Sequence, residues 1–382
     1  MLFKSPTLGK EELRVIDALK SIYNVLRYAL STPARWNGVL RRNMFARAIQ
    51  GSNSIEGYMV TKEDALAAVE GEKPLDANTE TWLAIVGYRN ALTYVLQLAK
   101  DQRFVFNEGF LRSLHYMMIS HDLSKHPGNW RPGPIYVRDE SRGENVYEGP
   151  PADILPRLIK ELTLYLMGSQ DKEHLIVKAA MAHLNLVMIH PFSDGNGRMG
   201  RCLQTLVLTS RGIGDPAFSS IEEYLGRNTQ AYYSVLAETG QGSWNPQNST
   251  RKWIRFNLAA HYIQAVTMLS RTRMIAKLWG ELETYIKNHH LPDRVIFALS
   301  DTAMGYQLRS SHYRHAAEVS AVLASRDLKS LVTAGMLLPS GERRGRVYRA
   351  SDSLRDVWLR IRNDEPRKIA DPFETLGDLV MG

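Results

Sequence analysis

Two strongly apolar helical segments, joined by a short connection, constrain the fold of this chain more than any other feature of its sequence. Apolar residues recur at helical spacing through residues 172–189 and again through 198–210, after which Arg211-Gly212 predicts the end of the second helix. Helices that are apolar over most of their surface have to be buried, and a connection of a few residues makes them neighbours. We therefore expect both segments in one helical core, with their connection held rigidly at its edge.

Much of the remaining chain also favours helices. The same periodicity predicts helices over 10–31, 61–70, 78–100, 107–121, 152–167 and 251–279. Thr61 is expected to be the N-cap of the second of these. Prolines and glycines in residues 127–137 exclude a helix, while Ile135 and Val137 favour a short strand, so we expect a hairpin or flap there. With 382 residues, 44% hydrophobic and 23% charged, the chain has the composition of an ordinary globular protein of more than one domain.

The connection between the two apolar helices carries residues suited to binding phosphate. It has the sequence HPFSDGNGRMGR, from His190 to Arg201. Gly195 and Gly197 allow successive backbone N–H groups to face one side, and the helix that begins near Gly197 directs its positive end to the same place. Arg198 and Arg201 are three residues apart and so share one helix face, where both could bind phosphate oxygens.

Two further side chains of the connection suit the chemistry of phosphates. Asp194 offers a carboxylate to Mg²⁺, a cation that prefers oxygen ligands and bridges phosphates. His190 offers a base whose unperturbed pKa is about 6.5. A phosphate cradle, a metal ligand and a base in one connection predict a phosphoryl- or nucleotidyl-transfer site.

The residues from His190 to Arg201 match the pattern H-x-F-x-[D/E]-G-N-G-R-x-x-R, and the chain thereby resembles the Fic (Fido) family over about residues 40–265. This resemblance implies a mainly α fold, a Fic-type helical bundle with a β-hairpin flap. It also implies a transferase that moves AMP from ATP to a Ser, Thr or Tyr hydroxyl of a target protein or of the enzyme itself. ATP as substrate and Mg²⁺ as cofactor follow from the same resemblance.

The resemblance gives each motif residue a role. His190 would deprotonate the incoming hydroxyl, and Asp194 would bind Mg²⁺ on the α- and β-phosphates. Phe192 would anchor the loop in the core without taking part in the chemistry. The phosphate chain would be held, as pyrophosphate leaves, by the backbone around Gly195, Asn196 and Gly197 together with Arg198 and Arg201.

Two segments outside the motif resemble other parts of a Fic site. The flap at 127–137 resembles a hairpin that pairs with an extended target segment by main-chain hydrogen bonds. Tyr232 and Tyr233 lie in a segment similar to the one that closes the nucleotide pocket; either could line the base, and one of them fits an ordinary core position equally well. His183 and His261 stand on apolar helix faces, and we expect both to be core residues.

Upstream, the sequence SNSIEG from Ser52 to Gly57 matches the pattern [S/T]-x-x-x-E-[G/N]. In the Fic family this element lies on a helix beside the nucleotide pocket, where its glutamate pairs with the second arginine of the motif and blocks the productive position of the γ-phosphate. The resemblance therefore implies a regulatory pair between Glu56 and Arg201 and an autoinhibited enzyme. A Glu56 that only stabilises the surface of its helix is the alternative.

The C-terminal segment has a different pattern. Residues 316–324 and 326–334 favour two helices, the second with Ser325 as N-cap, and strand-like pieces around a basic turn follow at 340–349. This is the order of a winged helix-turn-helix, and many Fic proteins carry a similar C-terminal domain. Residues 309–349 include eight Lys or Arg and three Asp or Glu, a local charge of +5. Such a domain would bind DNA, or alternatively another protein or a second copy of the chain.

Charge and cysteine content limit the partners and the compartment. The 48 Lys and Arg exceed the 40 Asp and Glu by 8, a surplus that suits an anionic nucleotide as well as a nucleic acid. Cys202 is the single cysteine, which excludes an intramolecular disulfide or a cysteine-based zinc cluster and favours a reducing compartment. The chain has no run of eighteen apolar residues, so we expect a cytoplasmic protein without a membrane partner.

These patterns predict four parts: an N-terminal helical region with the inhibitory helix (1–105), a catalytic core (106–265), a linking helix (266–290) and a winged-helix-like domain with a tail (291–382). The leading hypothesis is an autoinhibited protein adenylyltransferase. Two alternatives stay open. One is transfer of a different phosphate-containing group by the same fold, and the other is a winged-helix DNA-binding regulator with a vestigial Fic domain.

Overall fold

The computed structural model describes residues 1–31, 34–74, 76–139, 143–168, 173–210, 220–342, 346–365 and 369–378. The chain divides into two compact units. Unit 1 comprises Met1–Val25, Arg41–Val266 and Ala370–Gly382, and unit 2 comprises Leu26–Leu40 and Thr267–Ile369. Three helices contribute residues to both units: α1 (Lys10–Ser31), α2 (Asn37–Ile55) and α12 (Arg251–Asn288). The four-part division by role stays a prediction.

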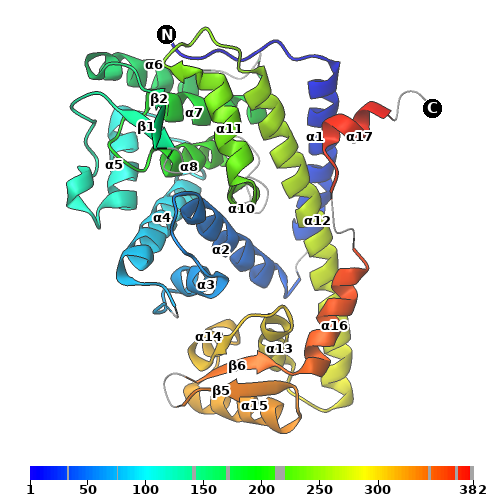
Figure 1. The fold of residues 1–382 in the computed structure, drawn as a ribbon. Coiled ribbons are helices and arrows are strands. Elements are labelled where there is room, and N and C mark those ends of the chain that lie inside the picture. Colours follow the sequence, from blue (N-terminus) through cyan, green and yellow to red (C-terminus); the bar gives the residue numbers. More distant parts are fainter. Residues whose placement is uncertain are drawn as a thin grey trace. The chain divides into compact units, whose positions relative to one another are not determined.

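Unit 1 is mainly helical (Figure 1). Its other helices are α3 (Lys62–Glu70), α4 (Thr79–Leu98), α5 (Glu108–Ile119), α6 (Leu155–Met167), α7 (Leu175–Ile189), α8 (Asn196–Thr209), α10 (Glu222–Arg227), α11 (Thr229–Gly240) and α17 (Pro372–Asp378), with 3₁₀ turns at Leu123–Lys125 and Ala152–Ile154. The helices predicted from apolar periodicity are confirmed to within a few residues, although α12 continues to Asn288 rather than ending at 279. Thr61 caps α3 as predicted, since its hydroxyl accepts the Asp64 N–H at 3.1 Å.

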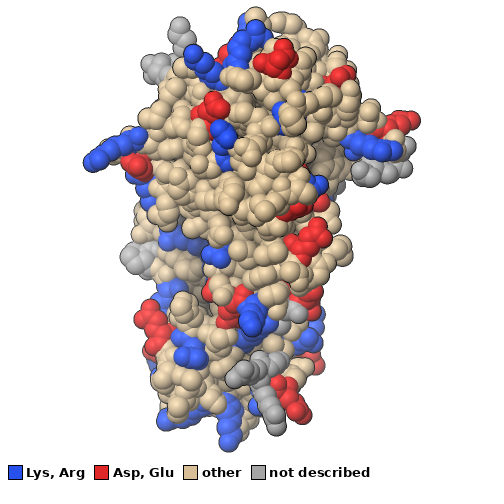
Figure 2. All heavy atoms as spheres, turned by 90° about the vertical axis from the view of Figure 1, so that its left-hand side faces the viewer, with Lys and Arg blue, Asp and Glu red and all other residues tan. Residues whose placement is uncertain are grey.

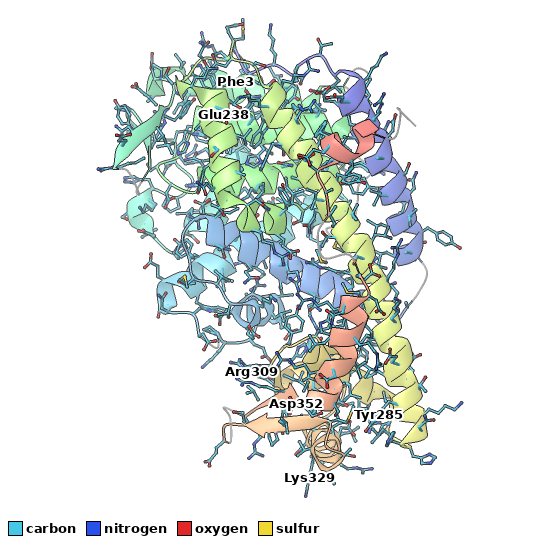
Figure 3. All side chains as sticks on the ribbon, turned by 45° about the vertical axis from the view of Figure 1, so that its right-hand side comes forward. Phe3, Glu238, Tyr285, Arg309, Lys329 and Asp352 are labelled. Carbon is cyan, nitrogen blue, oxygen red and sulfur yellow. The ribbon has the colours of Figure 1, made fainter. Side chains whose placement is uncertain are left out.

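The core of unit 1 is built on α7 and α8, which are almost wholly buried, as their apolar composition requires. The N-terminal segment is tied to α7 by Phe3, which is labelled in Figure 3: its N–H donates to Asn185 Oδ1 at 2.9 Å and its carbonyl accepts from Asn185 Nδ2 at 3.2 Å. The predicted end of the second apolar helix at Arg211-Gly212 lies outside the described residues.

A three-stranded sheet lies beside this core, in the order β1 (Tyr136–Asp139), β2 (Glu144–Glu148) and β3 (Gly242–Ser243). The hairpin predicted over 127–137 is therefore placed too early, because only Tyr136 and Val137 of that range are in a strand. Proline cannot donate to a strand ladder, so pairing starts only after Pro134, with Tyr136 opposite Glu148.

Unit 2 contains a 3₁₀ turn at Asp293–Val295 and then α13 (Ile296–Ala303), β4 (Leu308–Arg309), α14 (Ser310–Ala316), α15 (Ala321–Thr333), β5 (Leu337–Ser340), β6 (Val347–Ala350) and α16 (Asp352–Asn363). Its strands pair in the order β4-β6-β5. This succession of helices and hairpin has the order of a winged helix-turn-helix, whose assignment here stays a prediction.

The helix boundary predicted inside unit 2 is wrong. The N-cap of α15 is Ser320, whose hydroxyl accepts the Leu323 N–H at 3.3 Å, whereas Ser325 lies within the helix. Alanines and leucine after Ser320 are good helix formers, so the helix starts at the first available cap. The strand-like pieces predicted at 340–349 coincide in part with β5 and β6, and the basic turn at 343–345 lies outside the described residues.

Within the described ranges, no helix has both the length and the apolar composition that crossing a membrane requires. Lys and Arg side chains are interspersed with Asp and Glu over the face shown in Figure 2. Charges of both signs distributed in this way give no large single-sign surface on that face, in keeping with the small net charge.

Candidate functional site

The loop from His190 to Gly195 joins α7 to α8 and carries most of the predicted site. Both ends have left-handed backbone, with φ of 50° at His190 and 74° at Gly195. A Cβ at Gly195 would lie 2.9 Å from Ile119 Cδ1, so glycine is needed for space as well as for conformation. Asn196 closes the loop, because its side chain accepts the Phe192 N–H at 3.0 Å and donates to the Phe192 carbonyl at 2.8 Å. The Asn196 side chain therefore holds the loop, which leaves its backbone for the predicted phosphate contact.

The first turn of α8 and its two arginines form the anion-binding part of the site. The first N–H groups of a helix have no intrahelical acceptor, and the helix dipole favours negative charge at this end. The side chains of Arg198 and Arg201 are only 2% and 1% exposed. Among the described residues, Nε and Nη1 of Arg198 and Nη1 of Arg201 have no hydrogen-bond acceptor. Buried charged donors without acceptors cost roughly 1–3 kcal/mol each, so the geometry fits an anion that would satisfy them.

Glu56 and Ser52 occupy the other donors of Arg201. Arg201 Nη2 donates to Glu56 Oε1 at 2.6 Å and to the Ser52 carbonyl at 3.0 Å, and Nε donates to Ser52 Oγ at 2.8 Å. Burial by itself lowers the pKa of the Arg201 guanidinium, but the Glu56 carboxylate beside it raises that pKa above its usual value. The contact predicted between Glu56 and Arg201 is thus present, with Ser52 as a second anchor.

Glu56 is brought to this position by a glycine-dependent turn at the end of α2. The Gly57 N–H donates to the Ser54 carbonyl at 3.1 Å, and the Tyr58 N–H donates to the Asn53 carbonyl at 3.2 Å. These are the two bonds of a Schellman motif, and Gly57 has the left-handed backbone that the motif requires, with φ of 86°. The sequence pattern allows Gly or Asn at this position because these two residues adopt the left-handed conformation most readily.

His190 has one ring nitrogen in a hydrogen bond, and the other has no partner among the residues that the structure describes. Its Nδ1 lies 3.0 Å from the Val187 carbonyl, an acceptor, so Nδ1 carries the proton and Nε2 is left as the basic nitrogen. Burial lowers the pKa of His190 to about 4, and the Arg131 cation acts in the same direction. The imidazole is therefore neutral at pH 7 and able to accept a proton.

Asp194 is the candidate metal ligand. Its carboxylate accepts the Gly195 N–H at 2.6 Å and lies 3.8 Å from Lys125 Nζ and 3.9 Å from Arg198 Nη2. The described part of the chain holds no group of three or more His, Cys, Asp or Glu side chains that could form a metal site alone. Mg²⁺ commonly binds through one or two carboxylates together with waters and substrate phosphates. The partly exposed Asp194, next to the unpaired arginine donors, fits that mode of binding.

Tyr232 and Tyr233 lie in different surroundings. Tyr232 is a core residue, 1% exposed, with its hydroxyl 3.0 Å from His183 Nε2. Tyr233 is 47% exposed, and its hydroxyl donates to the Ile55 carbonyl at 3.0 Å. Tyr233 therefore connects α11 to the last turn of α2. A role in lining the adenine base stays a prediction for both residues.

His183 and His261 are core residues, as expected. His183 Nδ1 donates to Gln204 Oε1 at 2.6 Å, and Gln204 Nε2 donates to His261 Nε2 at 3.0 Å. The hydroxyl of Tyr23 lies 3.3 Å from His261 Nδ1. Burial lowers the pKa of each imidazole to about 3, so both act as neutral hydrogen-bonding groups that join α7, α8 and α12.

His115 supports the loop from His190 to Gly195, although no sequence pattern identifies it. Its ring stacks on that of Phe192 with centroids 3.7 Å apart, which confirms Phe192 as a buried anchor. Its Nδ1 accepts the Gly128 N–H at 2.8 Å, so Nε2 carries the proton and donates to the Asp194 carbonyl at 3.0 Å. The signal in the sequence is slight, a histidine on an amphipathic helix far from the motif.

Arg131 lies upstream of β1 and ties the segment that leads into the hairpin to the loop from His190 to Gly195, a contact that no sequence pattern predicts. Its backbone N–H donates to the Pro191 carbonyl at 2.9 Å, and its Nε donates to the His190 carbonyl at 2.8 Å. From β2, the Tyr147 hydroxyl donates to the Met188 carbonyl at 2.8 Å. These contacts fix the hairpin beside His190. The signal in the sequence is an arginine among prolines and glycines, because an arginine side chain can donate hydrogen bonds to the carbonyl groups of a loop.

Glu222 is a buried carboxylate beneath α2. The hydroxyls of Tyr88 and Thr205 both donate to its Oε1 at 3.2 Å. Burial raises the pKa of Glu222. A Cβ at Gly51 of α2 would clash with the Glu222 backbone carbonyl. Close approach of α2 to α10 thus depends on glycine at position 51, and no local pattern could have revealed it.

Comparisons with known proteins point to one family. The family model described as "Fic/DOC family" matches residues 105–208, which run from the segment before α5 to the last turn of α8 and include the whole loop from His190 to Gly195. Protein adenylyltransferase Fic of Nematostella vectensis is 27% identical over 216 residues, 54% of this chain and 45% of that protein. Protein adenylyltransferase Fic of Drosophila mojavensis is 26% identical over 277 residues, 69% of this chain and 52% of that protein. The chain spans about half the length of these curated relatives.

A solved structure shares the fold. The crystal structure of a Fic family protein from Desulfovibrio desulfuricans G20 is 23% identical in sequence, with a TM-score of 0.55, and the match covers 91% of this chain and 98% of that one. At this identity the likeness shows a common fold.

Proposed function

Because this chain belongs to the Fic family, as its motif predicts, we propose that it is a protein adenylyltransferase whose activity Glu56 holds back. It would transfer AMP from ATP to a Ser, Thr or Tyr hydroxyl of a target protein or of itself. One observation carries the proposal: the loop that leads into α8 carries the neutral imidazole of His190, and the first turns of α8 carry two buried arginines; within the described residues, neither the imidazole Nε2 nor several of the arginine N–H groups have a hydrogen-bond partner. This arrangement suits a phosphate chain on one side and a hydroxyl on the other.

In the proposed reaction, the target hydroxyl oxygen attacks the α-phosphorus of ATP. The new O–P bond forms as the bond from the α-phosphorus to the oxygen of the β-phosphate breaks, and pyrophosphate leaves with that electron pair. His190 Nε2 accepts the hydroxyl proton, since Nδ1 is already protonated and donates to Val187. Arg198, Arg201 and the N-terminus of α8 stabilise the charge on the phosphates. Mg²⁺ held by Asp194 would neutralise part of the phosphate charge.

The contacts of Arg201 support inhibition by Glu56. The carboxylate uses Nη2 of the guanidinium, and Ser52 uses Nε and Nη2, so Nη1 is the nitrogen that finds no acceptor among the described residues. A phosphate approaching Arg201 would meet the negative charge of Glu56, whose Oε1 lies 2.6 Å from Nη2 of this guanidinium. ATP would then bind with its phosphates displaced, and displacement of the reacting atoms by about 1 Å can cost 10²-fold in rate.

The position of the hairpin supports target binding by strand addition. Within the described residues β1 is an edge strand, since its sheet has the order β1-β2-β3. An extended target segment could therefore pair with β1 through main-chain hydrogen bonds. Arg131 and Tyr147 would keep that segment close to His190.

Incubation of the protein with α-labelled ATP and, separately, with γ-labelled ATP tests the proposal. Label incorporated into protein from the α position only is the expected result. Incorporation from the γ position would favour transfer of a different phosphate-containing group. No incorporation from either, even in the Glu56→Gly variant, would contradict the enzyme and favour a regulator with a vestigial Fic domain.

A second function, binding of duplex DNA by unit 2, is favoured by the exposed face of α15. Arg326 and Lys329 are exposed there, and Figure 3 shows Lys329 on the outer side of the helix. The single acid of this helix, Asp327, is buried and accepts from Arg294 Nε at 2.7 Å and Nη2 at 2.9 Å. A face with cations and no carboxylate suits a phosphate backbone. A second copy of the chain or another protein on this face is the alternative.

A further inference from the structure

The segment that follows α2 contacts both motif arginines, in different ways. Glu56 meets Arg201 at the edge of the guanidinium, where its carboxylate takes up an N–H group at 2.6 Å. Tyr58, two residues later, meets Arg198 at the face, with the guanidinium carbon 5.6 Å from the ring centroid. The Schellman turn at Gly57 makes both contacts possible, because it reverses the chain between the two side chains.

A face contact leaves the donors of an arginine unused. All five N–H groups of a guanidinium lie in its plane, whereas an aromatic ring attracts the cation from above that plane. In agreement, Nε and Nη1 of Arg198 have no acceptor among the described residues, and Nη2 is 3.9 Å from Asp194 Oδ1, beyond hydrogen-bond distance. Arg198 is therefore held in place without an ion pair that uses up its hydrogen-bonding capacity.

We infer that Tyr58 is a positioning residue for Arg198: its ring fixes the guanidinium by one face and leaves the in-plane N–H groups for the phosphate chain of the nucleotide. This inference rests on the proposed function, since it assigns a nucleotide phosphate to Arg198. The aromatic face is what acts, because the Tyr58 hydroxyl makes no hydrogen bond within the part of the chain that the structure describes. Phenylalanine at position 58 should therefore hold Arg198 as well as Tyr58 does, whereas an aliphatic residue of similar size should not.

Isothermal calorimetry on the full chain tests this role. All proteins carry Glu56→Gly so that Arg201 does not limit binding, and the ligands are ATP, inorganic pyrophosphate and adenosine. Tyr58→Leu should weaken ATP and pyrophosphate about 2- to 30-fold, the range for a partly to fully desolvated cation–π contact. Tyr58→Phe should stay within about twofold of the parent. Met59→Ala is the matched control, because Met59 is the next residue and is 87% exposed. Adenosine, which has no phosphate, should bind all variants equally.

Three results would overturn the inference: unchanged ATP and pyrophosphate affinity in Tyr58→Leu, an equal loss in Tyr58→Phe, or an equal loss for adenosine, which would mean that the pocket itself had collapsed. The proposed function fails separately. If Tyr58→Leu weakens pyrophosphate binding while the Glu56→Gly protein transfers no AMP, Tyr58 keeps its role and the transferase is contradicted. If AMP is transferred and Tyr58→Leu binds normally, the transferase survives and Tyr58 has no such role.

Discussion

At the scale of single residues, the proposed activity depends most directly on His190 and Glu56, whose states are set by their neighbours. The Val187 carbonyl fixes the proton of His190 on Nδ1, and Arg201 fixes the carboxylate of Glu56. Neither side chain is needed to build the core, because both lie at ends of helices rather than inside them. Substitutions at these two positions should therefore change catalysis without unfolding the protein.

His190→Ala should abolish AMP transfer and leave nucleotide affinity nearly unchanged. Loss of a general base typically costs 10²- to 10⁴-fold in rate, whereas the phosphate contacts come from α8 and do not use the imidazole. Incorporation of α-label in the Glu56→Gly background and calorimetry with ATP would measure the two effects. His289→Ala is the control, since His289 is exposed and lies in unit 2. Turnover equal to that of the parent would show that another group is the base.

Glu56→Gly should raise AMP incorporation strongly, by about tenfold or more, because it frees Arg201 for the phosphates. Glu56→Gly combined with His190→Ala should be silent. Glu238→Ala, which breaks the exposed ion pair with Lys252, is the matched control and should leave incorporation unchanged. Most substitutions near an active site lower activity, so the direction is informative. A well-folded Glu56→Gly protein with equal or lower incorporation would contradict autoinhibition even if the catalytic assignment held.

The ring of His190 should stay neutral down to unusually low pH. Burial lowers the pKa of His190 to about 4, so its basic form persists well below pH 6.5 and is lost only as the pH falls through about 4. Nitrogen NMR of histidine-labelled protein, with His190→Ala used to assign the signal, would measure this directly. No titration of the His190 signal is expected between pH 5 and 8, and a midpoint near 6.5 would mean that the ring is solvated.

At the scale of elements, the proposed inhibition depends on how closely α2 approaches α10. Gly51 faces the Glu222 carbonyl, and a Cβ at Gly226 of α10 would lie 2.8 Å from Gly51 Cα. Where two helices meet through glycines in this way, no side chain lies between them that could move to make room for an added atom. The contact at Gly51, about one turn before Glu56, thus sets the distance between α2 and α10 and thereby the position from which Glu56 contacts Arg201.

Gly51→Ala should therefore destabilise the protein and at the same time raise AMP incorporation, because the added methyl displaces α2 from α10. Overpacking of this kind typically costs 1–3 kcal/mol. Thermal melting and α-label incorporation would follow the two effects. Gly38→Ala on the same helix has open space around the new Cβ and should do neither. A fall in melting temperature without a rise in incorporation would show that α2 does not move as a unit.

At the scale of the whole molecule, the small positive charge predicts weak rather than tight binding to nucleic acid. The net charge is +8 for the chain, and residues 309–349 contribute +5 of it, although Asp327 in this range is already paired with Arg294. The residues that carry these cations belong to unit 2, which is compact by itself.

The full chain should bind a 30-base-pair duplex of random sequence weakly, with an affinity that falls steeply with salt, as expected for a small basic patch. Fluorescence anisotropy between 50 and 200 mM salt would measure it. Arg326→Glu with Lys329→Glu should abolish the binding, whereas Arg273→Glu, exposed on α12 of the same unit, should change it little. Tight, sequence-selective binding at physiological salt would instead favour the DNA-binding regulator.

The sequence by itself determined the features that depend on neighbouring residues. Apolar periodicity predicted α7 and α8, Thr61 was predicted as the cap of α3, and the motif from His190 to Arg201 revealed the resemblance to the Fic family, because helix propensity, capping and loop conformation are local properties. The predicted positions of the hairpin and of the start of α15 were wrong, because two local signals competed in each case. In the hairpin, prolines competed with strand-forming residues, and before α15 two serines competed as N-caps.

Tertiary structure alone decided the contacts that cross long stretches of chain. Arg201 meets Ser52 and Glu56 across about 145 residues, and His115 reaches Asp194 across 79. A family pattern revealed the first of these contacts, but nothing in the spacing of residues revealed the second, or the ring of Tyr58 over Arg198. Such contacts depend on how whole helices pack, and packing brings together residues whose separation in sequence carries no information about their distance in space.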